Sequence, residues 1–329
     1  MSVDARGAAG TLLVTGGDVV TMNERREVLV GGAVAVAGDR IVAIGSTTAL
    51  RAAHPGAAEL DASGCVVTPG LVDAHQHHTG DTLVRSSIPD NLPPGDSIYK
   101  WAIPLHAAHS AEDDRLSSLL TCVESLRNGV TTVVEAGTVA YPDKVAEAML
   151  EAGLRGTVGR WTSDVEGVPL AGSTDEVLAE AEALLDRYPS GGLVTAWVTL
   201  VGHSLGSDDL MARAADLARA RDARMTMHMS PSVADSRDYL ARTGARPLVH
   251  LDRLGVLGPH LVLGHAVHLD DAELDLLLAT RTAVAYCPWA YLRLGQGVTQ
   301  AGRHAEIVER GGRVALGCDS SNAGDAIER

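Results

Sequence analysis

The sequence predicts an α/β protein in which a small β domain precedes a (β/α)8 TIM-type barrel. Three observations favour this class. From residue 66 onward, apolar runs of five to eight residues alternate with helix-like stretches of ten to twenty, which is typical of parallel sheets. Eight such runs are present, and eight parallel strands close a barrel of this type. No GxGxxG motif follows the first run, so the alternative, a doubly wound open sheet, is less favoured.

The first 67 residues have the pattern of short strands rather than helices. Residues 11–22, TLLVTGGDVVTM, contain Gly16-Gly17, which we interpret as a turn. Residues 28–45 contain Gly38-Asp39 between two apolar alternating segments, and such a pair is typical of a β-hairpin. We therefore expect a small β unit at this end of the chain.

The barrel elements are expected at specific ranges. Strands are predicted at residues 65–75, 131–136, 155–161, 193–201, 224–229, 260–265, 282–287 and 313–319. Amphipathic helices are predicted at residues 111–129, 174–188 and 207–222. These helical stretches have Ser or Thr with Asp near their starts, which favours helix initiation there. The functional site of such a barrel lies at the carboxyl ends of its strands.

The composition limits the classes of partner. The chain of 329 residues has a net charge of −15 and no basic cluster, which disfavours nucleic acid because phosphate backbones require a positive surface. No signal peptide is visible, and no apolar run approaches the roughly 18 residues that span a membrane. The four cysteines are scattered without a CxxC pair, as free thiols in a reducing cytoplasm would be. We expect a cytoplasmic protein with a small-molecule substrate.

A concentration of histidines follows the first predicted barrel strand. The stretch VDAHQHHTGD, residues 72–81, places three histidines within four positions. Because strand side chains alternate between two faces, His75 and His77 share one face with Asp73, whereas His78 takes the other. Two imidazoles on one face indicate a metal site, and a polar loop is the alternative.

Three further predicted strands end in a residue type that binds metals. His228 ends the strand at 224–229, His265 ends the one at 260–265, and Asp319 ends the last. The methionines beside His228 would occupy the opposite face and pack against the outer helices. Each residue alone has a structural alternative. Together, three imidazoles and a carboxylate suit Zn²⁺ or Fe²⁺ with an open position for water. Such an ion supplies hydroxide near neutral pH, and a neighbouring histidine can move the proton.

Several motifs resemble those of a known family. The segments PGLVDAHQHH, TTVVEAG, HMS, LGHAVHLDDAELDLL and VALGCDSSNAGD resemble the amidohydrolase superfamily. The nearest branch contains the cytosine, guanine and S-adenosylhomocysteine deaminases and the triazine chlorohydrolases. The resemblance runs from about residue 11 to the end of the chain. It implies that residues 1–67 form the N-terminal part of a small β-sandwich domain. Residues 68–329 would then form a hydrolase barrel that is incomplete at its C-terminus.

The resemblance also implies a site and a reaction. The implied metal ligands are His75, His77, His228 and Asp319. His265, together with Asp319, falls on the catalytic positions, and His203 resembles a histidine that contacts substrate. Relatives with two ions carry a carboxylated lysine in strand four, where this chain has none, so one Zn²⁺ or Fe²⁺ is expected. The implied reaction is hydrolytic deamination, or related C–N or C–halogen hydrolysis, of a small polar heterocycle. A homodimer is compatible with the resemblance.

Two positions depart from the family pattern. Deaminases of this branch carry a glutamate three residues after the strand-five histidine, whereas this chain has Pro231. Proline cannot transfer protons, so Ser230 or Ser232 through water, or His265 alone, must substitute if deamination is retained. The alternative is a catalytically degraded member that binds a metal or a ligand. Lys100 stands where nucleoside-acting relatives carry a glutamate that holds ribose hydroxyls. We interpret it as a contact for an anionic substrate group, with a solvated surface cation as the alternative.

Three more residues have assignments that rest on position. Arg85 is interpreted as a substrate contact, with a salt bridge that fixes its loop as the alternative. Trp289 follows strand seven, where relatives shape the wall of the pocket. Glu135 ends strand two at a position usually occupied by Asp, and we interpret it as a supporting residue rather than a direct participant.

Overall fold

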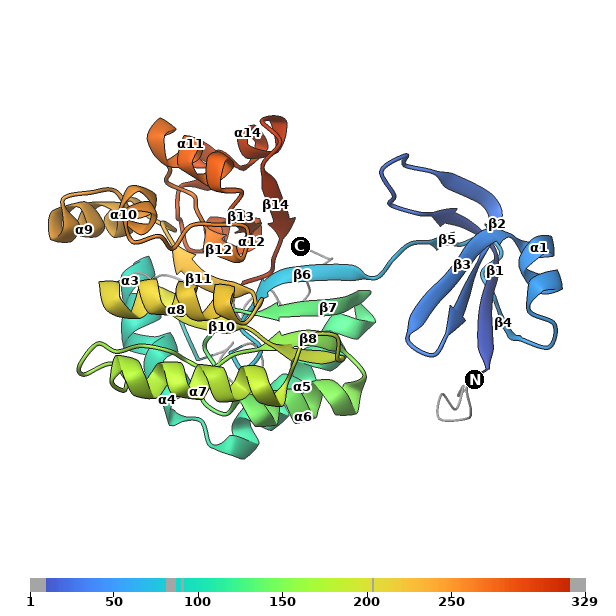
Figure 1. The fold of residues 1–329 in the computed structure, drawn as a ribbon, viewed down its shortest axis with the longest axis horizontal. Helices are drawn as coiled ribbons and strands as arrows, with labels where there is room; N and C mark the ends of the chain where they lie inside the picture. The colour runs from blue at the N-terminus through green and yellow to red at the C-terminus, as the bar shows by residue number, and fades with distance from the viewer. Residues whose placement is uncertain (1–9, 81–86, 90–91, 203, 320–329) are drawn as a thin grey trace. The chain divides into compact units, whose positions relative to one another are not determined.

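The computed structural model describes residues 10–80, 87–89, 92–202 and 204–319 (Figure 1). The chain divides into two compact units, Met1–Gly70 and Leu71–Arg329. Within the described ranges, no helix combines the length and the apolar character that crossing a membrane requires.

Within residues 10–70, the N-terminal unit is a five-stranded sheet with one helix. Its strands are β1 (Thr11–Val20), β2 (Val28–Ala37), β3 (Arg40–Ser46), β4 (Ala58–Asp61) and β5 (Val66–Val67). The order is β3-β2-β1-β4, and β5 also pairs with β1. β2 and β3 pair antiparallel around Gly38-Asp39, so the predicted hairpin is confirmed. Helix α1 (Thr47–Ala53) was not predicted; its Leu50 packs into a core with Leu13, Ala33 and Ala35.

The interpretation of Gly16-Gly17 as a turn was wrong. β1 runs through both glycines, and its register with β2 shifts on either side of Gly17. Gly16 has a φ of +79°, a conformation that glycine adopts without a steric penalty. The pair therefore forms an irregularity of the β-bulge kind within one strand. Gly17 also permits a close approach of β5, because a Cβ at this position would lie 2.7 Å from Val67 Cγ2.

The second unit contains parallel strands that alternate with helices, as predicted for an α/β protein. One sheet has the order β6-β7-β8-β9 and the other β10-β11-β12-β13-β14. The strands are β6 (Leu71–Gln76), β7 (Val130–Glu135), β8 (Arg155–Val158), β9 (Val194–Ala196), β10 (Val198–Gly202), β11 (Met225–Met229), β12 (Leu261–His265), β13 (Ala283–Tyr286) and β14 (Arg313–Leu316). Trp197 alone separates β9 from β10, and a parallel bridge joins Gln76 of β6 to Asp319 after β14.

The first predicted barrel strand, residues 65–75, is two strands. Val66–Val67 is β5 and pairs with β1 in the N-terminal sheet, whereas Leu71–Gln76 is β6 and pairs with β7. Thr68, Pro69 and Gly70 separate them. A proline has no backbone N–H to donate to a ladder, so it interrupts an otherwise continuous apolar run. The predicted strand at 193–201 is likewise divided, at Trp197.

The three predicted helices are present as α5 (Ala111–Arg127), α7 (Thr174–Arg187) and α8 (Asp208–Ala220). Ser110, Ser173 and Ser207 cap their first turns through side-chain hydrogen bonds, which satisfies backbone N–H groups that have no helical partner. The other helical elements are α3 (Pro94–Asp96), η1 (Ser97–Ala102), α4 (Ile103–Ala108), α6 (Pro142–Ala152), α9 (Val233–Thr243), α10 (Pro247–Arg253), α11 (Asp271–Thr280), α12 (Pro288–Arg293), α13 (Val298–Ala301) and α14 (His304–Glu309).

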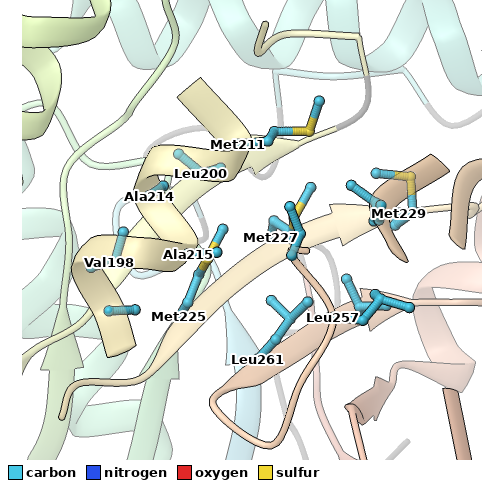
Figure 2. Close-up of a cluster of buried hydrophobic side chains, with 14 of the residues drawn as sticks. Val198, Leu200, Met211, Ala214, Ala215, Met225, Met227, Met229, Leu257 and Leu261 are labelled. Atoms are coloured by element: carbon cyan, nitrogen blue, oxygen red, sulfur yellow. The ribbon is translucent and has the colours of Figure 1, made fainter. Parts of the chain in front are cut away.

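The methionines of β11 pack on the helix side of the sheet. Met225, Met227 and Met229 are fully buried in one cluster with Ala214 and Ala215 of α8 (Figure 2). The prediction that these side chains face the outer helices is confirmed. Because side chains alternate along a strand, the same packing turns His228, between Met227 and Met229, to the opposite face. The packing of the methionines therefore places the His228 side chain on the face of the sheet that is opposite the helices.

Candidate metal centre

The ends of four strands bring together side chains of the types that bind metals in proteins. His75 lies in β6, His228 in β11 and His265 at the end of β12, and Asp319 follows β14. One ligand-type atom from each of these four residues lies within 4.8 Å of the others, and all four side chains are buried. The four are far apart in sequence, so the convergence results from the alignment of parallel strands at one edge.

His77 completes the group. Its Nε2 lies 3.0 Å from Asp319 Oδ1 and 3.2 Å from His228 Nε2. His75 Nε2 lies 3.5 Å from the same Asp319 oxygen. Ligand atoms held about 2.0–2.2 Å from one tetrahedral zinc ion lie roughly 3.3 Å apart. The three separations bracket that value, so the spacing of these donor atoms is compatible with ligands of one ion.

The ring of His75 supports the same conclusion. It has no exposed surface; its Nδ1 has no hydrogen-bond partner among the described residues, and its Nε2 faces the Asp319 carboxylate at 3.5 Å. Buried polar atoms in proteins are almost always hydrogen-bonded. A buried imidazole with an unsatisfied nitrogen is therefore costly unless another group, such as a metal ion, binds the ring. The donor set of imidazoles and a carboxylate fits Zn²⁺ or Fe²⁺.

Two hydrogen bonds orient the rings in the cluster. His228 Nδ1 lies 2.7 Å from the carbonyl oxygen of Val201. A carbonyl only accepts, so Nδ1 carries the proton and Nε2 presents its lone pair to the cluster. His77 Nδ1 lies 2.7 Å from Thr138 Oγ1, which leaves His77 Nε2 facing Asp319. Partners of this kind fix the tautomer and the orientation of metal-binding histidines.

Glu135 supports this arrangement from the end of β7. Its carboxylate accepts hydrogen bonds from the backbone N–H groups of Gly137, at 2.6 Å, and Thr138, at 3.3 Å. It therefore holds the turn that presents Thr138 to His77. Burial raises the pKa of Glu135 to about 7. This geometry agrees with the supporting role that we predicted.

Asp319 is fixed by its backbone as well as by its side chain. Its N–H donates to the carbonyl of His75, at 2.7 Å, and its own carbonyl accepts from the N–H of His77, at 3.1 Å. Burial raises the pKa of the carboxyl, but His265, His75 and His77 lower it further, so the net pKa lies well below the ordinary value. The side chain is therefore an ionised carboxylate suited to a metal.

Glycines leave the space that the histidines occupy. A Cβ on Gly264 would lie 2.5 Å from Cε1 of His75. Gly202, at the end of β10, has a φ of +83°, and a Cβ there would lie 2.2 Å from the carbonyl oxygen of His228. Real Cβ atoms do not approach other atoms this closely. Larger residues at either position would displace a member of the cluster.

We expect the Gly264→Ala variant to bind zinc at least about tenfold more weakly, because the new methyl group displaces the His75 ring and altered ligand support typically costs 10- to 100-fold in affinity. The measurement is competition with a chromophoric chelator. Gly258→Ala is the matched control, since its Cβ would press on the His260 ring at 2.7 Å, away from the cluster. Equal zinc affinities for the two variants would contradict the prediction.

A cavity opens beside the cluster. His77, His228, His265 and Asp319 contribute to its wall, and the space between atoms is about 880 Å³, part of it open to solvent. The remaining wall is largely apolar. It includes Ile98, Ile103, Val201, Leu205 and Leu294. A concave, mostly apolar pocket with a few convergent polar groups is the usual form of a small-molecule site.

The structure does not bring all predicted substrate contacts to this cavity. Lys100 is not among the lining residues; its Nζ pairs with Asp96 Oδ1 at 2.9 Å and its side chain is 69% exposed. This placement favours the alternative of a surface cation. Trp289 lies on α12, half-buried, and does not line the cavity either. Arg85 and His203 lie outside the described residues.

Most residues of the cavity wall were missed by the sequence analysis, and three of them carry polar atoms that a ligand could meet: His106, Trp161 and Gln296. His106, on α4, is buried and its Nδ1 lies 3.3 Å from Thr79 Oγ1. Trp161 and Gln296 are also buried, and Trp161 Nε1 and Gln296 Oε1 have no hydrogen-bond partner within the described part of the chain. All three belong to helices or loops, where no motif marks them.

Comparison with known proteins identifies the family. The model of the amidohydrolase family matches residues 66–329. The chain belongs to the amidohydrolase family. Residues 32–57 match the bacterial imidazolonepropionase-like composite domain. The resemblance drawn from the motifs is thereby confirmed, and with it the general class of hydrolase.

Relatives of known name are similar over most of this amidohydrolase. The 5-methylthioadenosine/S-adenosylhomocysteine deaminase of Syntrophobacter fumaroxidans is 32% identical over 96% of this chain and 70% of its own length. A zinc-bound adenosine deaminase from Xanthomonas campestris is 27% identical, with a TM-score of 0.84 over 96% of this chain and 71% of its own. The zinc-bound atrazine chlorohydrolase of Arthrobacter aurescens is 21% identical, with a TM-score of 0.83 over 95% and 73%. This last likeness supports the predicted fold.

Proposed function

We propose that this amidohydrolase binds one divalent metal ion through His75, His77, His228 and Asp319 and hydrolyses a C–N bond of a small aminated heterocycle. The observation that carries the proposal is the convergence of these buried side chains, at separations of 3.0–3.5 Å, beside a largely apolar cavity. Zn²⁺ and Fe²⁺ both suit this donor set, and zinc is present in the similar adenosine deaminase.

When bound, the metal supplies Lewis acidity that activates water near neutral pH. The side chain proposed to move the proton is His265. It is buried in the cavity wall, and its ring centroid lies 5.2 Å from that of His75 and 5.3 Å from that of His228. In deamination, His265 takes a proton from the attacking water and delivers it to the leaving amine. Positioned acid–base groups of this kind contribute about 10²–10⁴ in rate.

We propose an aminopurine nucleoside with an apolar substituent as the substrate. Similar proteins are named as deaminases of 5-methylthioadenosine and S-adenosylhomocysteine, and Ile98, Ile103 and Leu205 supply an apolar wall. Trp161 and Gln296 contribute buried polar atoms to the same wall. Such atoms favour ligands that complete their hydrogen bonds, because a ligand that lacks matching groups leaves them unpaired. Dechlorination of a halogenated heterocycle is a related reaction for the same site.

Pro231 favours a second candidate function. It lines the cavity at the position where the family pattern has an acidic residue, and proline has no proton to give. Ser232 is occupied as the cap of α9, and neither Ser230 nor Ser232 lines the cavity. His106 does line it, and burial lowers its pKa to about 3, so its neutral ring is suited to hydrogen-bond substrate. If His106 and His265 do not compensate, the chain binds its ligand without turnover.

The test is metal analysis together with an ammonia-release assay on 5-methylthioadenosine. We expect about one Zn or Fe per chain and measurable turnover. A ratio near two would contradict the single-ion site. Metal without turnover, on a panel of aminated and halogenated heterocycles, would favour the binding function. Absence of metal from the folded protein after incubation with Zn²⁺ would refute the proposal.

The Pro231→Glu variant separates the two candidate functions. For a degraded deaminase, we expect an increase in turnover of about 100-fold, because a general acid is restored. Pro231→Gln is the control, since it has the size of glutamate without the acid. An increase in both variants would attribute the effect to loss of proline rather than to proton transfer. An unchanged rate in Pro231→Glu would indicate that the wild-type site has its own proton donor.

A further inference from the structure

We propose that His304, on α14, is a positioning residue that holds His265 in its working orientation. The catalytic consequence rests on the proposed function, whereas the structural consequence does not. His304 lies 39 positions from His265 in the sequence and is not among the residues that line the cavity. The two histidines are connected by a direct hydrogen bond and by contacts of both rings with Tyr291.

The backbone at His265 has an unusual conformation. His265 has a φ of +83° and the following Ala266 a φ of +50°. Residues with a Cβ seldom adopt this left-handed region, because the side chain crowds the backbone. A strained conformation at a functional position persists only when the surrounding structure imposes it. The contacts of the His265 peptide therefore decide where its ring points.

His304 supplies one of those contacts. Its Nε2 lies 2.7 Å from the carbonyl oxygen of His265, and both residues are buried. Because a carbonyl only accepts, Nε2 carries the proton. Burial lowers the pKa of His304, with an opposing contribution from this hydrogen bond, so the ring is neutral. On the other side of the same peptide, the N–H of Ala266 donates to Met229 of the neighbouring strand, at 2.9 Å.

Two tyrosines hold the His304 ring and connect it to the His265 ring. The centroid of His304 lies 4.3 Å from that of Tyr286 and 6.0 Å, in a stacked arrangement, from that of Tyr291. Tyr291 in turn meets the ring of His265 edge-on at 5.5 Å, and its hydroxyl donates to the carbonyl of Ala285. His304 thus fixes the backbone of His265 while Tyr291 fixes its ring.

Removal of the His304 Nε2 donor should allow the backbone at His265 to change its conformation. The carbonyl of His265 would be left buried without its partner, a state that folded proteins avoid. The peptide is then free to leave the left-handed conformation, which carries the His265 ring away from the cluster. Misplacement of a reacting group by about 1 Å can cost around 100-fold in rate. We expect the effect to fall on turnover rather than on substrate binding, because His304 does not line the cavity.

Two variants separate the effect of the His304 hydrogen-bond donor from the effect of its aromatic ring. His304→Phe keeps an aromatic ring against the tyrosines but has no donor, whereas His304→Gln keeps an N–H donor at the end of the side chain. His250→Phe is the matched control, because His250 is also buried, bonds Asp208 at 2.8 Å and packs edge-on against Tyr239. We expect the crystal structure of His304→Phe to show a negative φ at His265, and that of His304→Gln to retain the positive value.

Kinetics supply the second measurement, with 5-methylthioadenosine as the probe. We expect His304→Phe to lower kcat at least tenfold with KM changed less than twofold, and His304→Gln to restore most of kcat. His250→Phe should lower thermal stability without lowering kcat. If the wild type shows no turnover, the proposed function fails, and the crystal structures still decide the positioning role. A His265 that keeps its φ and its ring position in His304→Phe would overturn the inference.

Discussion

The His228→Ala variant is expected to lose its bound metal and at least 99% of any turnover. His228 Nε2 lies 3.2 Å from His77 Nε2, and the hydrogen bond from Nδ1 to Val201 aims it there. Alanine removes one of the proposed metal ligands. Loss of a residue that only supports a ligand already lowers metal affinity by about 10- to 100-fold. Elemental analysis after dialysis measures the ratio of metal to chain. We expect about one ion per wild-type chain and less than about 0.1 in the variant.

The control for this experiment is His260→Ala. His260 is buried, and burial lowers its pKa, but it lies before β12 rather than at its carboxyl end. It should therefore keep the wild-type metal content with some loss of stability. Full metal content in a folded His228→Ala protein would show that the cluster does not bind the ion as proposed.

His265→Gln is expected to lose about 10²–10⁴ in kcat and to keep its metal. His265 is proposed to transfer a proton rather than to bind the ion. Proton transfer by a positioned side chain contributes a rate factor of about this size. The structure makes this a sharp test, because His265 belongs to the group of four residues whose donor atoms lie within 4.8 Å of one another. The measurements are metal content and kcat for each variant.

His77→Gln is the matched counterpart. His77 Nε2 lies 3.0 Å from Asp319 and its Nδ1 is held by Thr138, so we propose it as a ligand. This variant should lose metal and activity together. If instead His265→Gln loses the ion and His77→Gln retains it, the two histidines have exchanged roles, and the proton carrier must be sought among His77 and His106.

The general plan of the site could be predicted from the sequence. Strand side chains alternate faces, so the methionines at 225, 227 and 229 place His228 on the opposite face of the sheet. Parallel strands present their carboxyl ends at one edge, so a histidine or aspartate at the end of each strand implies a common cluster. His75, His265 and Asp319 followed from the same argument. These patterns are local in the sequence, so they can be recognised without knowledge of how distant segments pack.

Other features depended on contacts between distant segments. His106 and His304 belong to helices, and Trp161 and Gln296 to loops, where no periodicity predicts a neighbour. Lys100 was expected at the substrate because of its position in a motif, yet it pairs with Asp96 at the surface.

By itself, the sequence determined that strands alternate with helices and that histidines and an aspartate stand at strand ends, because both follow from the short period of local backbone geometry. Only the tertiary structure decided which apolar runs pair with which. Val66–Val67 belongs to the N-terminal sheet because it pairs with β1. It also decided that His304 reaches the carbonyl of His265. Such contacts join residues far apart in the chain, so local sequence patterns do not predict them.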